Sequence, residues 1–301
     1  MKYYLSIDAG TSVIKTVIFS QEFKIKFKSS IENKVQTDPK GKSEINMNSF
    51  WSLTSKLIKS SIKKSKIKNL DILGVGITGN MVGVWPVNTK GKSVRNAILW
   101  NDARSKEIFD KIQINNPKIY QNIFDLTGSI VQFGCTIPVI KWLEKNEPQI
   151  IKKTDYFLTC KDWIRLNLTN EFNNDHTERA VAPGDIKKAD LSLKIFNLLK
   201  LNKKYLSKFP QIKKSQDIAG HITSRAARET GLLNGTPVII GLGDVPAAAI
   251  GVGAIYNNQT STIIGTTCHN YLVSSKPIFF PKNSGLLFYS PNNQWLRTMI
   301  N

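Results

Sequence analysis

Apolar and polar positions along the chain predict strands and helices in alternation. Apolar residues recur through Lys2–Ile7 and resume at Val13 after a short polar turn, which indicates a β-hairpin. Phe23–Ser30 continues this hairpin as a third antiparallel strand. Asn46 then precedes a segment that places its apolar side chains on one face through about Lys64, which predicts a capped helix.

The later segments continue the same alternation. Strands are expected at Ile72–Ile77, Val82–Val87, Ala97–Trp100, Pro237–Ile240, Ser261–Ile264, Asn270–Ser274, Gly285–Tyr289 and Trp295–Ile300. Helices are expected at Ser105–Gln113, Pro138–Lys145, Lys161–Leu168, Leu191–Leu206, Thr223–Thr230 and Pro246–Gly253. This order of elements predicts an α/β fold built on a mixed sheet.

Length and composition are those of a globular protein of one large domain or two. The 301 residues are 41% hydrophobic and 21% charged. Apolar runs stay below membrane-spanning length, and the first residues lack the pattern of a signal peptide. Cys135, Cys160 and Cys268 are scattered without metal-ligand spacing. We therefore expect a cytoplasmic protein that does not enter a membrane.

The formal net charge of +20 raises nucleic-acid binding as an alternative function. Only seven of the 42 basic residues are arginine, the usual reader of bases and phosphates. The lysines are spread along the chain, and aromatic residues do not interleave with them. Nucleic acid is thus an unlikely partner by composition, and affinity that survives physiological salt would be needed to support it.

The tip of the first hairpin carries candidate chemistry. Asp8 ends the first strand, and Gly10, Thr11 and Ser12 form the turn. A glycine allows an anion to approach the backbone, hydroxyl and N–H groups donate to it, and an acid can hold hydrated Mg²⁺. The turn is thus a candidate phosphate clasp, and the alternative is an ordinary hairpin with a polar tip.

Two later segments add to this candidate. Ile263–Thr267 is a second strand that ends in a polar turn, so two such turns facing each other would hold phosphates from both sides. Between them, Asp244 follows Gly241–Gly243 and opens a helix. Asp244 is either a helix N-cap or a carboxylate placed to accept the proton of an attacking hydroxyl.

Five motifs follow one another in a fixed order. They are Asp8-x-Gly10-Thr11-Ser12-x-x-Lys15, Gly74–Met81, Ala97–Arg104, Gly243-Asp244 and Gly265-Thr266-Thr267. In order, spacing and placement at strand ends, these motifs resemble the FGGY family of carbohydrate kinases. The segment from Gly134 through Trp142 resembles a signature region of the same family. The resemblance runs along the whole chain and is greater to the xylulose and L-xylulose kinase branches than to glycerol kinase.

The resemblance implies a ribonuclease-H-like fold of the actin/hexokinase superfamily. It also implies ATP- and Mg²⁺-dependent phosphorylation of a hydroxyl on a sugar or polyol, such as a ketopentose. Asp244 would be the general base, and Asp8 would hold the Mg²⁺. The phosphates would contact Gly10, Thr11, Ser12, Lys15, Gly265, Thr266 and Thr267.

The resemblance assigns the sugar pocket to a second set of residues. They are Asn80, Met81, Trp100 and Asp102, with Arg104 in support. A core aromatic is the alternative for Trp100, and a gap-filling side chain is the alternative for Met81. Val82 departs from the pattern, because xylulose kinases usually have a histidine after the loop methionine, and valine cannot hydrogen-bond a sugar hydroxyl.

The resemblance also divides the chain into two domains. Residues 1–255 would form a complete first, sugar-binding domain, and residues 256–301 would only begin the second, nucleotide-binding domain. We therefore expect weak or absent kinase activity from this chain alone, and a separately encoded C-terminal half as a candidate partner. A non-catalytic sugar-binding or interaction remnant is the alternative, and a homodimer is also open.

Overall fold

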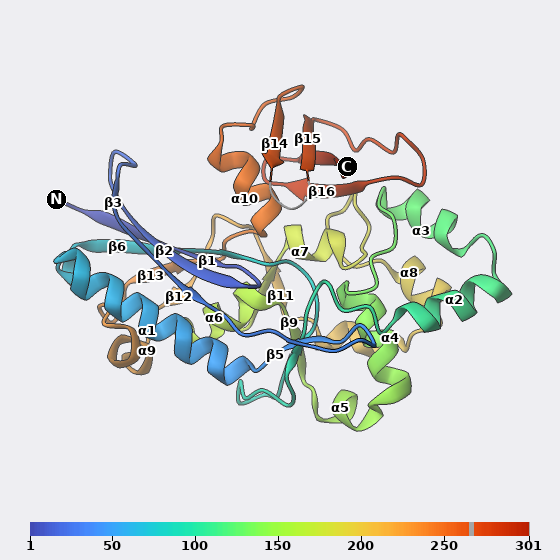
Figure 1. Cartoon of the computed structure of the whole chain (residues 1–301), viewed down its shortest axis with the longest axis horizontal. Coiled ribbons are helices and arrows are strands. Elements are labelled where there is room, and N and C mark those ends of the chain that lie inside the picture. The colour runs from blue at the N-terminus through green and yellow to red at the C-terminus, as the bar shows by residue number, and fades with distance from the viewer. Residues whose placement is uncertain (265–267, 301) are drawn as a thin grey trace.

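The fold is built around a mixed β-sheet, seen edge-on in Figure 1. The computed structural model describes residues 1–264 and 268–300. In these residues the largest sheet has six strands in the order β12-β13-β6-β1-β2-β3. They are β1 (Tyr3–Ala9), β2 (Val13–Ser20), β3 (Ile25–Glu32), β6 (Ile72–Gly79), β12 (Ile218–His221) and β13 (Pro237–Ile239). The first three form an antiparallel meander, as predicted. β6 and β13 run parallel to β1, so the sheet is mixed.

A second, antiparallel sheet lies near the C-terminal end, in orange and red in Figure 1. Its order is β14-β15-β17-β16. The strands are β14 (Thr260–Ile264), β15 (Cys268–Ser274), β16 (Leu286–Ser290) and β17 (Gln294–Ile300). Smaller sheets join β4 (Gln36–Thr37), β5 (Ser43–Ile45) and β8 (Ala97–Ile98); β7 (Trp85–Val87) and β9 (Tyr156–Leu158); and β10 (Asn173–Asp175) and β11 (Gln211–Lys213).

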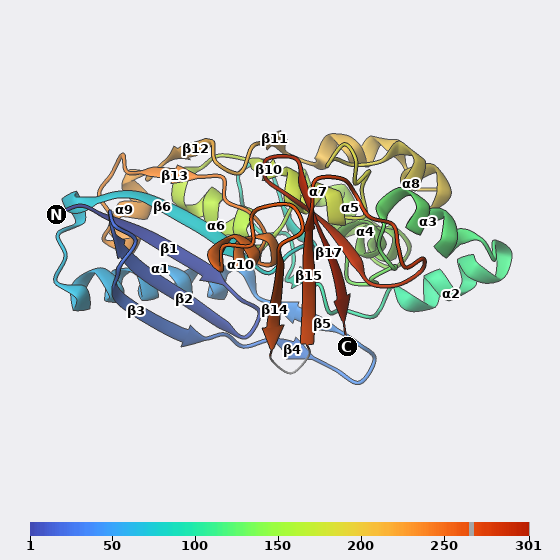
Figure 2. The same cartoon turned by 90° about the horizontal axis from the view of Figure 1, so that it is seen from above.

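Helices cover one face of the large sheet and form a separate group at the end far from the N-terminus (Figures 1 and 2). They are α1 (Met47–Ser65), α2 (Lys106–Asn115), α3 (Ile119–Thr127), α4 (Thr136–Asn146), α5 (Pro148–Lys153), α6 (Cys160–Thr169), α7 (His176–Val181), α8 (Leu193–Leu198), α9 (Ser224–Thr230) and α10 (Asp244–Gly251). Short 3₁₀ helices occupy Asn69–Asp71 and Lys203–Lys208. No helix in the described ranges has both the length and the apolar character to cross a bilayer.

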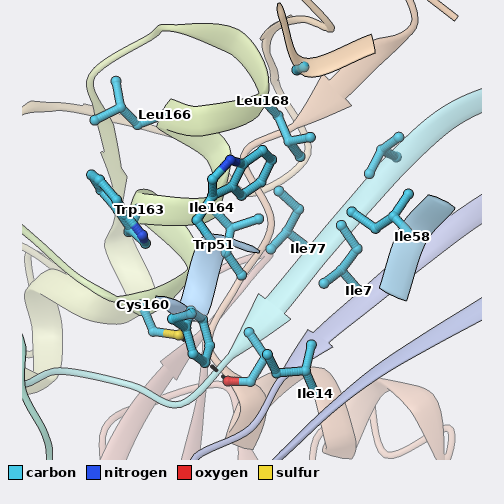
Figure 3. Packing of buried hydrophobic residues seen from close by; sticks show 14 of the residues in the cluster. Ile7, Ile14, Trp51, Ile58, Ile77, Cys160, Trp163, Ile164, Leu166 and Leu168 are labelled. Atoms are coloured by element: carbon cyan, nitrogen blue, oxygen red, sulfur yellow. Dashed lines mark hydrogen bonds between the residues drawn. The ribbon is translucent and has the colours of Figure 1, made fainter. Parts of the chain in front are cut away.

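The main core lies between the large sheet and helices α1 and α6. Ile7 and Ile77 point from the sheet toward Ile58 of α1 and Ile164 of α6, as Figure 3 shows. Burial of each such side chain stabilises the fold by about 1.5–3 kcal/mol. Cys160, at the start of α6, is fully buried among them, and its thiol lies 3.6 Å from the carbonyl oxygen of Ala9.

A smaller apolar cluster joins the C-terminal sheet to the rest of the molecule. Tyr271, Val273 and Leu296 of that sheet pack with Met81 and Val82, which follow β6. The C-terminal sheet therefore shares a core with the loop that follows β6.

Two predicted elements differ from the structure by three or more residues at one end. The helix expected over Leu191–Leu206 ends at Leu198, because Lys200 adopts a positive φ of 49° and the Leu201 N–H bonds back to the Phe196 carbonyl oxygen over 2.9 Å. Asn202 then caps a separate 3₁₀ helix through a bond from the Lys204 N–H. The strand expected over Val82–Val87 begins only at Trp85. Val82 has a positive φ of 55°, so the chain turns there before it extends.

Candidate functional site

The first hairpin forms as the sequence predicts and presents its polar tip at one end of the sheet. Asp8 and Lys15 are directly opposed on β1 and β2, and the Lys15 ammonium lies 3.2 Å from the Asp8 carboxylate. Both side chains are partly exposed. A Cβ at Gly10 would lie 2.6 Å from the Val13 carbonyl oxygen, so the turn requires glycine there. Ser12 is exposed at the same tip.

Trp100 is attached to this tip. Its indole N–H donates to the Thr11 hydroxyl over 2.9 Å, and 44% of its surface is exposed. A Cβ at Gly134 would lie 1.8 Å from the Trp100 carbonyl oxygen, so the segment before α4 packs directly against it. Trp100 is therefore not a core aromatic. Through this bond, Trp100, which the resemblance assigns to the sugar pocket, contacts Thr11, which the resemblance assigns to the phosphates.

Asp244 is the first residue of α10. Gly241 precedes it with a φ of 74°, and a Cβ there would lie 1.9 Å from the Ile77 carbonyl oxygen, so the loop passes tightly over the end of β6. Burial raises the pKa of Asp244 to about 7; the bond from the Val245 N–H opposes this rise, and the charge of Asp8 adds to it. The Asp8 carboxylate thus lies close enough to raise the pKa of Asp244.

The loop after β6 packs beside the Asp244 loop. The Thr78 hydroxyl donates to the Leu242 carbonyl oxygen over 2.8 Å. Met81 lies against Gly243, where a Cβ would be 2.3 Å from its sulfur. Asn80 is buried, and its amide donates to the Ala9 carbonyl oxygen over 2.9 Å. Asn80 and Met81 therefore contact Ala9 and Gly243, the residues next to the two candidate carboxylates, and these contacts tie the loop to β1 and to the Asp244 loop.

Asp102 and Arg104 belong to an ion-pair network beside Trp100. Asp102 is buried and accepts from the Ser43 N–H over 2.8 Å. Arg104 pairs with Asp102 and with buried Glu44, each at 2.8 Å, and its guanidinium stacks on the Trp142 ring. In this structure both residues bond to the Ser43–Glu44 segment of β5 and so stabilise the backbone near Trp100.

The second predicted turn, Gly265, Thr266 and Thr267, lies outside the described residues. The flanking strands β14 and β15 pair in register from Thr260 opposite Leu272 to Ile264 opposite Cys268.

The structure also contains a buried ionic cluster that the sequence analysis missed. It consists of Lys161, Asp162 and Arg165 on α6, with Asp175 before α7 and Glu178 on α7, each at most 2% exposed. The Lys161 ammonium contacts Asp175 and lies 3.2 Å from Glu178. Opposite charges within one cluster offset the cost of removing each from water.

The ionisation of this cluster follows from its composition. Burial acts against the charged form of Asp162, but Lys161 and Arg165 outweigh it and lower the pKa of Asp162 to about 2. Burial raises the pKa of Glu178; Lys161 opposes that rise, and Asp175 and Asp162 add to it.

Two sequence signals could have indicated the cluster. Lys161, Asp162 and Arg165 interrupt an apolar helix with charges on more than one face. Asp175 followed by Thr177 is a typical helix N-cap, and the Asp175 side chain accepts from the Thr177 N–H over 2.8 Å.

Asp8 fits a Mg²⁺ that also binds nucleotide phosphates. Such ions keep several waters and use only one or two protein carboxylates, and Asp8 offers one partly exposed carboxylate at a strand end. Among residues 1–264 and 268–300, no group of three or more histidine, cysteine, aspartate or glutamate side chains forms a metal site by itself.

Comparison with known proteins decides the family. Residues 3–251 match the N-terminal domain of the FGGY family of carbohydrate kinases. The chain belongs to this family. Among its FGGY relatives, it is 31% identical over 271 residues to the xylulose kinase of Bacillus subtilis, covering 89% of this chain and 52% of that protein. It is 28% identical over 267 residues to the probable L-xylulose kinase of Haemophilus influenzae, covering 88% and 54%. The chain thus spans about half the length of these relatives.

Solved structures agree on the fold. The ligand-bound xylulose kinase of Lactobacillus acidophilus superposes with a TM-score of 0.89 at 20% identity, over 99% of this chain and 59% of that chain. The glycerol kinase of Plasmodium falciparum with ADP gives 0.88 at 21% identity, over 100% and 61%. The chain therefore has the fold of these sugar kinases, which is the actin/hexokinase-type fold that the family resemblance implied.

Proposed function

We propose that this FGGY chain supplies the sugar-binding part of a kinase that transfers the γ-phosphoryl group of ATP to a hydroxyl of a ketose or related polyol. The observation that carries this proposal is the placement of Asp244. Its carboxyl starts a helix beside the polar hairpin of Asp8 and next to the loop of Asn80 and Met81. A carboxylate of raised pKa between a phosphate turn and a sugar loop suits the general base of phosphoryl transfer.

Asp244 would accept the proton of the attacking hydroxyl as its oxygen bonds to phosphorus. The pKa of about 7 makes its carboxylate a stronger base than that of an ordinary aspartate. Near neutral pH, a substantial fraction of the molecules still has Asp244 ionised and able to accept a proton. Met81 and Asn80 would form the floor beneath the sugar, and the exposed ring of Trp100 would cover one side of it.

ATP and Mg²⁺ follow from the same proposal. Asp8 would hold the hydrated ion, which supplies charge neutralisation on the phosphates. Lys15 and the turn of Gly10, Thr11 and Ser12 would contact the phosphates from one side. Gly265, Thr266 and Thr267 would contact them from the other.

The proposal assigns residues 1–255 to the sugar-binding domain and residues 256–301 to the first part of the nucleotide-binding domain. Because the relatives are about twice as long, we propose that a C-terminal half, as a separate chain or as a continuation, completes the ATP site. A cytoplasmic location, where ATP is abundant, remains a prediction.

Calorimetry on the purified chain tests the sugar site without ATP. D-xylulose, L-xylulose, ribulose and glycerol are titrated in turn, and at least one ketose is expected to bind. Asp244→Asn is expected to retain binding, because asparagine keeps the size and hydrogen-bonding capacity of the side chain. Absence of binding by every sugar would refute the proposed sugar site.

A coupled ADP-release assay with the same sugars tests the kinase. The chain alone is expected to turn over weakly or not at all, and addition of a C-terminal half is expected to restore turnover that Asp244→Asn abolishes. Robust turnover by the chain alone would contradict the need for the second half. A complemented enzyme that is unaffected by Asp244→Asn would contradict the role of this carboxylate, and sugar binding without any turnover would favour the non-catalytic alternative.

A further inference from the structure

Helix α7 hydrogen-bonds to both loops of the proposed site, the loop after β6 and the loop before Asp244. The Glu178 carboxylate accepts from the Val82 N–H over 2.7 Å, in the loop after β6. One residue earlier, the Thr177 hydroxyl accepts from the Gly243 N–H over 3.0 Å, in the loop before Asp244. Thr177, Glu178 and the Val82 backbone are buried, so water does not replace either bond.

The loop at Val82 requires such a bond. Val82 has a φ of 55°, which a β-branched residue rarely adopts, so its conformation must be fixed by its surroundings. Its N–H has the buried carboxyl group of Glu178 as acceptor over 2.7 Å, and leaving a buried N–H without an acceptor is costly. Glu178 therefore stabilises a backbone conformation at Val82 that valine by itself disfavours.

The two loops also depend on each other. The Met81 side chain fills the space over Gly243, so a shift of either loop displaces the other. The Thr177 hydroxyl, which accepts from Gly243, donates its own proton to Asp175. Lys161 contacts both Asp175 and Glu178, and its positive charge offsets part of the cost of burying the two carboxyl groups side by side.

We propose that Thr177 and Glu178 are positioning residues that fix the Asn80–Val82 loop and the Gly241–Gly243 loop in a single arrangement. This inference rests on the proposed function, because it assigns these loops to the sugar and to the base. Neither residue touches the reacting atoms. They act through the backbone of Val82 and Gly243. The buried ionic cluster, in turn, holds Thr177 and Glu178 in place through Asp175 and Lys161.

Thr177→Val tests the proposal with little change in shape. Valine removes the acceptor of the Gly243 N–H, whereas Thr177→Ser keeps a hydroxyl and serves as the rescue variant. Thr54→Val is the matched control: Thr54 is also fully buried, and its hydroxyl donates within α1 to the Phe50 carbonyl oxygen, outside the two loops.

The first measurement is hydrogen exchange of the intact chain, followed by peptide. Thr177→Val is expected to speed exchange in peptides that cover both 78–84 and 241–245, with β1 and β2 unchanged. Thr177→Ser is expected to restore protection, and Thr54→Val is expected to leave both peptides protected. Unchanged exchange in 78–84 or in 241–245 would overturn the proposal. This measurement needs no sugar, so it decides the positioning role even if the proposed function fails.

The second measurement is the affinity for whichever ketose the wild-type chain binds. Loss of the buried acceptor is expected to weaken binding by about tenfold, while Thr177→Ser and Thr54→Val stay near wild type. Equal affinity of Thr177→Val and wild type would overturn the proposal. If Thr177→Val does not fold, Glu178→Gln replaces it, and faster exchange in both peptides is again the expected result; protection of both would count against the proposal.

Discussion

Gly241 and Gly235 both have positive φ angles, but their surroundings differ. A Cβ at Gly241 would lie 1.9 Å from the Ile77 carbonyl oxygen, whereas nothing lies within 4 Å of one at Gly235. Gly235→Ala is therefore expected to cost about 1 kcal/mol of unfolding free energy from backbone strain alone. Gly241→Ala is expected to cost about 3 kcal/mol or more, because β6 must also move. Urea unfolding followed by circular dichroism measures both, and equal losses would contradict the close approach.

Asp244 makes a pH-dependent contribution to stability. Its pKa is about 7 in the folded chain against an ordinary value of 3.8, so the folded state binds more protons between these pH values. Stability is therefore lost as the pH rises through this window. The interval between these two pKa values corresponds to about 4 kcal/mol, so Asp244→Asn, which removes that contribution, is expected to stabilise the chain by up to about this amount at pH 8.

Thermal melts of wild type and Asp244→Asn from pH 4 to pH 8 check this expectation. Because Glu178 also titrates with a raised pKa, the difference between the two curves is the relevant quantity. That difference is expected to grow with pH up to about 7 and then to level off. A difference that is constant across the range would contradict the raised pKa of Asp244.

At the scale of elements, helix α1 shows what local sequence can determine. Asn46 caps the helix, and its side chain accepts from the Ser49 N–H over 2.9 Å, as the sequence predicts. Asn46→Ala is expected to cost about 1 kcal/mol, and Asn46→Asp is expected to cost much less, because aspartate keeps the acceptor. Denaturant midpoints compare the three chains, and an equal loss in both variants would show that the cap bond contributes little.

Local signals predicted the elements whose pattern agrees with their surroundings. The first hairpin, the Asp244 helix start and the mixed sheet follow from alternation, glycines and strand ends within a few residues of each other. The helix expected over Leu191–Leu206 was wrong beyond Leu198, because the backbone turns at Lys200, whose φ is 49°.

The supporting contacts of the site could not be predicted in the same way. The bond from Val82 to Glu178 spans 96 residues of sequence, and that from Gly243 to Thr177 spans 66. No local pattern encodes such partners, since they depend on how α6 and α7 pack behind the sheet. The sequence could therefore name Asp8, Asp244 and Trp100 as candidates, and its charged positions could have indicated the buried cluster, but it could not identify which loops the cluster contacts.

At the scale of the whole molecule, the net charge of +20 is spread over the surface and is not confined to one site. Two of the basic residues, Lys161 and Arg165, form close ion pairs inside the protein. The remaining lysines are dispersed, so binding to nucleic acid is expected to be non-specific. Duplex affinity measured by fluorescence anisotropy is expected to fall about 10³-fold or more between 50 and 200 mM salt. Submicromolar affinity at physiological salt would contradict this expectation.

The three cysteines of the described fold are free and differ in burial, which makes them a graded chemical probe of opening. Cys268 is partly exposed, whereas Cys135 and Cys160 are buried and burial raises the pKa of both thiols. A thiol reagent is therefore expected to modify Cys268 first. Cys160 lies between α6 and the sheet, so its labelling rate reports the opening of the entire core, without an engineered label.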